Sequence, residues 1–192
     1  MKLINIQTLS FMLLAIAIAA TAQNPVRDTS GKPLRRGVEY YIKPAITDNG
    51  GRFTLINRNG SCPLYVGQEN TSAGRGLPVT FAPFVAEEKI VRETRDFKVS
   101  FAAATICVQS TTWKLDGELI GTGDDEGYDN YFYISPGEVE NTYVIGWCPN
   151  DACPGCRWLR CGQIGAIVED GKRLLVWAGR SVLPVVFERA RY

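Results

Sequence analysis

The sequence contains no histidine. Histidine is the usual base beside serine and cysteine nucleophiles and a common zinc ligand, so Ser-His-Asp and Cys-His catalysis and imidazole zinc sites are excluded. The densest acidic run, Asp124-Asp125-Glu126, lies among glycines, which favours a solvated turn over a catalytic acid pair. We therefore expect a protein that acts by binding rather than as an enzyme, with no metal and no cofactor.

The chain also has almost no net charge. Lys and Arg total 21 against 20 Asp and Glu, and the loss of Lys2 with a cleaved leader would balance the two signs. A balanced chain has no electrostatic attraction for nucleic acid or for an anionic membrane surface. We predict neither as a partner.

The N-terminus has the features of a secretory signal peptide. Met1-Lys2 supplies a positive charge, Phe11–Ala20 an apolar core, and Ala20-Thr21-Ala22 a small-residue cleavage site. Ten apolar residues are too few to cross roughly 30 Å of hydrocarbon, which disfavours a membrane anchor. The sequence predicts a signal peptide at residues 1–22, a single domain at residues 23–192, and secretion to the extracellular space or a vacuole.

Six cysteines form an even set that can pair completely in an oxidising compartment. Fifteen pairings are possible, and the spacing favours Cys62 with Cys107, which enclose 44 residues without another cysteine. We expect this pair to hold the intervening segment as an outward loop. A redox dithiol at Cys153-Pro154-Gly155-Cys156 would need a βαβ setting, and zinc binding is disfavoured by oxidation. The remaining four cysteines form a nested cluster, Cys148, Cys153, Cys156 and Cys161.

Two sequons predict N-glycosylation in a secreted chain. They are Asn59-Gly60-Ser61 and Asn70-Thr71-Ser72. Asn59 lies close to Cys62, where early disulfide pairing would hinder the transferase, so Asn70 is the better acceptor.

Strand patterns dominate the rest of the chain. Short runs rich in β-branched and aromatic residues recur about every ten residues between turn formers, which predicts an all-β barrel or sandwich of about a dozen strands. The residues 86–94 lack an apolar helical stripe and are expected to form a loop or short strand. The expected strands are 40–42, 53–56, 64–66, 79–81, 97–101, 113–115, 131–134, 143–145, 164–168, 174–177 and 185–187.

Several motifs resemble the plant Kunitz inhibitors of the soybean trypsin inhibitor type. They span nearly all of the chain after the leader, and the nested cysteine cluster is most similar to that of the miraculin-like branch. The matching segments are Asp28–Leu34, Gly37–Ile42, Cys62–Leu64, Gly76–Phe81, Ile106–Trp113 and Lys172–Leu174.

The resemblance implies an all-β, disulfide-stapled β-trefoil of twelve strands, six in a barrel and six in hairpins that cap it. It also implies the disulfides Cys62–Cys107, Cys148–Cys161 and Cys153–Cys156. Members of the family present a loop inside the first disulfide bracket to a serine protease, and other branches are associated with cysteine proteases. The expected partner is a secreted or digestive protease, bound by a monomer.

The family pattern places the reactive loop at Phe84, Val85, Ala86, Glu87, Glu88, Lys89 and Ile90. The primary specificity position falls at Glu87 or Glu88, and a carboxylate there would be repelled by the aspartate of a trypsin pocket. A shift in register would instead present Lys89-Ile90. The family braces this loop with an asparagine, and this chain has Arg36 at that position, so the brace is absent or replaced by a longer, charged one.

An alternative function is a non-inhibitory binding, storage or miraculin-like defence protein on the same scaffold. Its ligand would be a carbohydrate, a pigment or a receptor. Four tryptophans invite a ligand pocket, but tryptophans in a small β domain are more often core residues. We expect Trp113, Trp147 and Trp177 in the core and Trp158 exposed.

Overall fold

The computed structural model describes residues 23–46, 49–107, 109–124, 127–156, 158–179 and 181–191. The predicted signal peptide, Asp125 and Glu126 lie outside these residues. The described residues form twelve strands: β1 (Glu39–Pro44), β2 (Phe53–Ile56), β3 (Tyr65–Gln68), β4 (Val79–Pro83), β5 (Phe97–Phe101), β6 (Trp113–Asp116), β7 (Leu119–Thr122), β8 (Phe132–Pro136), β9 (Tyr143–Trp147), β10 (Gly162–Glu169), β11 (Lys172–Trp177) and β12 (Pro184–Arg189).

Six of the strands close into a barrel. β1 pairs with β4, β4 with β5, β5 with β8, β8 with β9, β9 with β12, and β12 returns to β1, all antiparallel. Closure leaves no free edge in this ring, so the backbone groups of every barrel strand have a neighbour on both sides.

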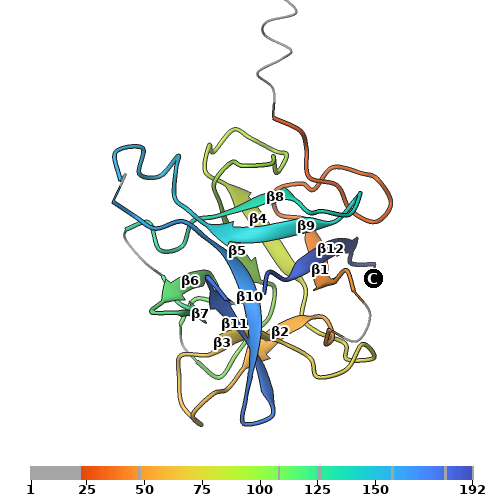
Figure 1. Cartoon of the computed structure of the whole chain (residues 1–192), viewed down its shortest axis with the longest axis vertical. Coiled ribbons are helices and arrows are strands. Elements are labelled where there is room, and N and C mark those ends of the chain that lie inside the picture. The colour runs from red at the N-terminus through yellow and green to blue at the C-terminus, as the bar shows by residue number, and fades with distance from the viewer. Residues whose placement is uncertain are drawn as a thin grey trace, which may run out of the picture.

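The other six strands form three hairpins at one end of the barrel. β2 pairs with β3, β6 with β7 and β10 with β11, and the three hairpins join through β3–β7, β7–β11 and β11–β3 contacts. Each third of the chain therefore contributes two barrel strands and one hairpin. This arrangement is a β-trefoil, seen in Figure 1 with the hairpins below the barrel.

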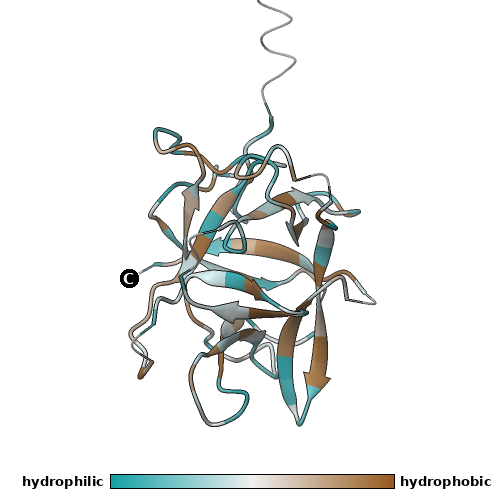
Figure 2. Cartoon of the chain, turned by 90° about the vertical axis from the view of Figure 1, so that its left-hand side faces the viewer, coloured by the Kyte–Doolittle hydropathy of each residue, from teal (hydrophilic) through white to brown (hydrophobic). Residues whose placement is uncertain are grey.

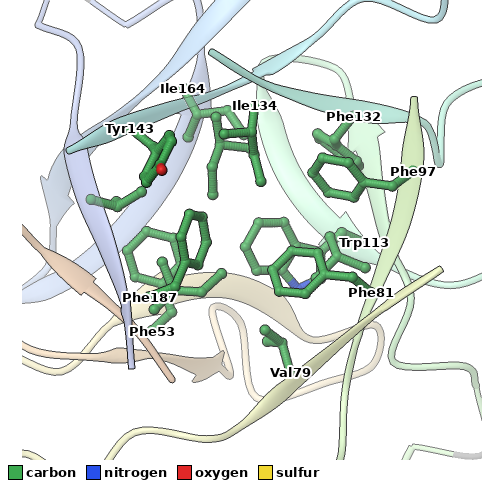
Figure 3. Packing of buried hydrophobic residues seen from close by; sticks show 14 of the residues in the cluster. Phe53, Val79, Phe81, Phe97, Trp113, Phe132, Ile134, Tyr143, Ile164 and Phe187 are labelled. Atoms are coloured by element: carbon green, nitrogen blue, oxygen red, sulfur yellow. The ribbon is translucent and has the colours of Figure 1, made fainter. Parts of the chain in front are cut away.

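The core lies inside the barrel and its hairpin cap. Alternate residues of the barrel strands point inward, as in β4, where Val79, Phe81 and Pro83 are buried and the residues between them are partly exposed. Figure 2 shows the resulting mixture of apolar and polar positions along the strands. Phe81, Phe132, Phe187 and Trp113 meet at the centre (Figure 3), each with at most 1% of its surface exposed.

The observed strands agree with the sequence prediction at eleven places. The prediction missed β7, because Leu119–Thr122 is short, contains a glycine and offers no alternating pattern. Residues 86–94 contain no helix, as expected. The expectation for the tryptophans is confirmed, since Trp113 and Trp147 are buried, Trp177 is half-buried and Trp158 is 73% exposed.

Three disulfides connect the loops. Cys62–Cys107 joins the β2–β3 connection to the β5–β6 connection, and Cys148–Cys161 and Cys153–Cys156 lie within the β9–β10 connection. With a sequence separation of 45 residues, the first contributes about 4 kcal/mol by restricting the unfolded chain. In the part of the chain that the structure describes, no helix is long and apolar enough to cross a membrane.

Candidate functional site

The predicted loop connects β4 to β5 and projects from the end of the barrel opposite the hairpin cap (Figure 1). We call residues 84–90 the reactive loop. The β4–β5 ladder ends at the pair Pro83 and Phe97. Just beyond it, the Phe84 N–H donates to the carbonyl oxygen of Asp96 at 2.9 Å. The loop therefore begins from a fixed point on the barrel rim.

The tip of the reactive loop is a tight turn. The Glu88 N–H donates to the Val85 carbonyl at 3.1 Å, which places Ala86 and Glu87 at the centre of the turn with both residues exposed. The Glu88 carboxylate is turned away from the tip and lies 3.6 Å from Nε of Arg92. Of the two glutamates predicted for the specificity position, Glu87 is thus the one that the loop presents.

The Arg36 side chain lies beneath the tip and binds the loop backbone at three points. Its Nη2 donates to the carbonyl oxygens of Pro83 at 2.6 Å and Val85 at 2.9 Å, and its Nε donates to that of Glu88 at 3.0 Å. Bonds from a charged donor are stronger than those between neutral groups, and the planar guanidinium fixes their directions. The brace that the resemblance predicted as an asparagine is therefore replaced by a longer, charged side chain.

The segment before β1 places this arginine. Arg35 forms a β-bridge with Ile90, and the Arg36 N–H donates to the Lys89 carbonyl at 2.9 Å. Gly37 then reverses the chain toward the barrel with a φ of 70°, a left-handed conformation that glycine adopts without strain. The N-terminal segment thus runs alongside the second half of the reactive loop and supports it.

These contacts leave a specific set of carbonyl groups available. The carbonyl oxygens of Val85, Glu88 and Lys89 already accept hydrogen bonds from Arg36 or the turn. In the described part of the chain, those of Ala86 and Glu87 have no partner. A carbonyl that a protease is to attack must be free to enter its oxyanion hole, so Ala86 and Glu87 are the exposed positions suited to it.

The structure also locates the remaining predicted sites. Cys62 and Cys107 enclose the reactive loop in sequence, but the contacts that hold the loop itself come from Arg36 and the β4–β5 ladder. Asn59 and Asn70 are both exposed, and the Asn70 amide donates to the Gly171 carbonyl at 3.0 Å. Both asparagines remain predicted glycosylation sites.

The sequence assigned no contact to Arg92, which pairs with Glu88, or to Asp96, which binds the start of the loop. The four-residue spacing of Glu88 and Arg92 was an available signal of opposite charges. Asp96 gave none, because its role depends on the barrel that brings its carbonyl to Phe84. Among the described residues, no group of three or more acidic or cysteine side chains is arranged to hold a metal ion.

The fold and the site define a β-trefoil that presents an exposed loop on a braced backbone. Residues 26–189 match the Kunitz legume family model, described as trypsin and protease inhibitor. Kunitz type trypsin inhibitor 104 of Medicago truncatula is 42% identical over 198 residues, covering 97% of each chain. Miraculin of Synsepalum dulcificum is 29% identical, covering 98% of this chain and 97% of miraculin.

A solved structure is similar over the same region. The bifunctional alpha-amylase/subtilisin inhibitor from Oryza sativa superposes with a TM-score of 0.76 at 32% identity, covering 88% of this chain and all of that one. The chain belongs to the Kunitz legume family of trypsin and protease inhibitors.

Proposed function

We propose that this protein inhibits an endopeptidase by presenting the reactive loop to the active-site cleft as a substrate would be presented. The observation that carries the proposal is the Arg36 guanidinium, which binds the carbonyls of Val85 and Glu88 on either side of the exposed tip. A loop held in one conformation loses little conformational entropy on binding, and this raises its affinity.

We expect the same brace to make cleavage of the reactive loop slow. If the protease cuts the bond after Ala86 or Glu87, the new ends remain attached to one guanidinium through Val85 and Glu88. The leaving amine then stays next to the acyl group, at the high effective concentration that favours resealing of the bond. Cys62–Cys107 keeps the two fragments covalently connected even while the bond is open.

The side chains at the tip define the target. Glu87 is exposed and acidic, so it suits a protease pocket that is cationic or that tolerates polar side chains, and it is repelled by the anionic pocket of trypsin. Lys89 is exposed as well, but its carbonyl accepts the Arg36 N–H. This contact supports Glu87 over Lys89 as the primary specificity residue.

The proposed partner is a serine endopeptidase, bound by a monomer that contributes no catalysis of its own. We place the protein in the extracellular space or a vacuole, because a chain with three disulfides is suited to an oxidising compartment.

An inhibition panel tests the proposal. The purified protein, residues 23–192, is titrated against trypsin, chymotrypsin, subtilisin, papain and a glutamyl endopeptidase. We expect inhibition of the glutamyl endopeptidase and of subtilisin, whose primary pocket is permissive, and weak or no inhibition of trypsin. Absence of inhibition across all five would contradict the proposal and would favour a non-inhibitory binding protein.

A further inference from the structure

The β9–β10 connection lies directly against the base of the reactive loop. We call residues 148–161 the disulfide loop, since Cys148–Cys161 closes it and Cys153–Cys156 lies inside it. Figure 1 shows it projecting beside the β4–β5 connection, at the end of the barrel away from the hairpin cap. The two loops come from different thirds of the chain and meet through two aspartates.

Asp96 and Asp151 bind each other's backbone. The Asp96 Oδ2 accepts the N–H groups of Asp151 at 2.7 Å and Ala152 at 2.9 Å. In return the Asp151 Oδ2 accepts the Asp96 N–H at 3.0 Å and Nε–H of Arg95 at 2.9 Å. Asp96 is 1% exposed, whereas the side chains of Arg95 and Asp151 are partly exposed, so Asp96 holds Asp151 and Ala152 of the disulfide loop from the buried side of this contact.

The same aspartate connects the disulfide loop to the reactive loop. The carbonyl oxygen of Asp96 accepts the Phe84 N–H, at the first residue of the reactive loop. Asp96 therefore binds both loops, the disulfide loop through its carboxylate and the reactive loop through its carbonyl oxygen. A protease seated on the reactive loop would meet the disulfide loop as a neighbouring surface that Asp96 holds at Asp151 and Ala152.

The outer face of the disulfide loop carries a large apolar side chain. Trp158 is 73% exposed, whereas Leu159 beside it packs against the core and fixes the backbone there. Pro154 and Gly155 are also exposed. Tryptophan is among the residues that contribute most to protein interfaces, because its large ring buries much area on binding.

A protease–inhibitor interface needs more contact surface than the reactive loop alone provides. Protease–inhibitor interfaces bury about 800 Å² on each partner and involve roughly 20–30 residues a side. The reactive loop supplies seven residues, from Phe84 to Ile90. Neighbouring segments must supply the rest, and the disulfide loop is connected to the reactive loop by the contacts of Asp96.

We propose that the disulfide loop is a second contact surface for the protease bound at the reactive loop, with Trp158 as its principal side chain. This inference rests on the proposed function. The complementary surface on the protease is an apolar or arginine-bearing patch beside its active-site cleft, since both pack well on an indole ring. The second contact adds affinity and selectivity among proteases that share the same primary pocket.

The test compares Trp158→Ser with Ile106→Ser against a protease that the wild-type protein inhibits. Ile106 is 88% exposed in the β5–β6 connection, which leaves β5 at Phe101, the end of the strand away from the reactive loop, so it is an apolar control. We expect Trp158→Ser to raise the inhibition constant about tenfold or more, mainly through faster dissociation, and Ile106→Ser to leave it unchanged. Equal constants for Trp158→Ser and wild type would overturn the inference.

Hydroxyl-radical footprinting provides a readout that needs no variant. The Trp158 side chain should be labelled strongly in the free protein and protected in the complex, and full labelling in the complex would contradict a second contact. Glu87→Arg separates the two proposals. If it changes the inhibition constant while Trp158→Ser does not, the inhibitor function stands and the second surface is refuted. Absence of inhibition by the wild-type protein refutes both.

Discussion

The Nε–H of Arg36 donates to the carbonyl oxygen of Glu88 at 3.0 Å, from beneath the two exposed residues at the tip of the reactive loop. The same guanidinium reaches the opposite side of the tip through Val85. One side chain therefore holds the backbone on both sides of the bonds that a protease would cut.

Replacing Arg36 with lysine should convert a stable inhibitor into a transient one. Lysine keeps the charge, but its single ammonium group cannot reproduce the planar fork that binds three carbonyls. We expect an inhibition constant raised at least tenfold, equivalent to about 1.4 kcal/mol, together with faster cleavage of the loop. Inhibition assays and mass spectrometry measure both. Arg35→Lys, at an exposed neighbour, serves as the control, and an equal loss there would contradict the role of Arg36.

Glu87→Arg should create a trypsin inhibitor. The substitution places a basic side chain on the exposed residue of the tip, whose carbonyl is free, and trypsin's anionic pocket would attract it. Glu88→Arg is the matched control, because the Glu88 carbonyl is bound by Arg36 and its side chain is directed toward Arg92. Titration against trypsin should show tight inhibition by the first variant alone. The reverse order would place the specificity residue at Glu88.

Asp28 should make stability depend on acid pH. Burial is the largest influence and by itself would raise the pKa of this carboxyl. The hydrogen bonds from Ser30, at 2.6 and 2.8 Å, and from the Lys32 amide, at 3.0 Å, outweigh it and hold the pKa below its usual value. A pKa lowered in the folded state contributes stability above about pH 4, which is lost as the pH falls through the folded value.

Urea unfolding of wild type and Asp28→Asn between pH 7 and pH 2 measures this contribution. The free energy of unfolding of the wild-type protein should fall more steeply with acid than that of the variant, since the variant has no carboxyl to protonate at this position. Parallel pH profiles for the two proteins would show that Asp28 does not contribute.

Trp113→Ala should destabilise the core by about 3–5 kcal/mol, the range found for large aromatic residues in well-packed interiors. Trp113 is fully buried, and its ring centroid lies within 6.0 Å of those of Phe53, Phe101 and Phe132. Trp158→Ala is the surface control and should change the free energy of unfolding by no more than about 0.5 kcal/mol. Chemical denaturation followed by circular dichroism distinguishes the two, and similar losses would contradict the assigned burial.

The sequence predicted the barrel well because its strands carry a strong local signal. Phe97–Phe101 alternates large apolar residues with polar ones, and the structure buries the apolar set on one face. β7 carried no such signal, since Leu119–Thr122 forms a strand only because β6, β3 and β11 pair with it.

The candidate site was only partly predictable for a related reason. The position of the reactive loop follows from local sequence and the family pattern. The sequence does not show which backbone carbonyl groups the long side chain of Arg36 reaches. The barrel places Arg36 and the loop together from positions nearly fifty residues apart. The contact between Asp96 and Asp151 spans 55 residues and depends equally on closure of the barrel.

The bond that a target protease cuts shows whether the braced tip of the reactive loop is the inhibitory site. The inhibitor is incubated with a small amount of an inhibited protease, and the products are analysed by mass spectrometry before and after reduction. We predict a single cut after Glu87, with the fragments joined by Cys62–Cys107 until that disulfide is reduced. A cut after Lys89, or an inhibited protease that leaves residues 84–90 intact while cutting elsewhere, would show that Glu87 is not the residue presented to the protease.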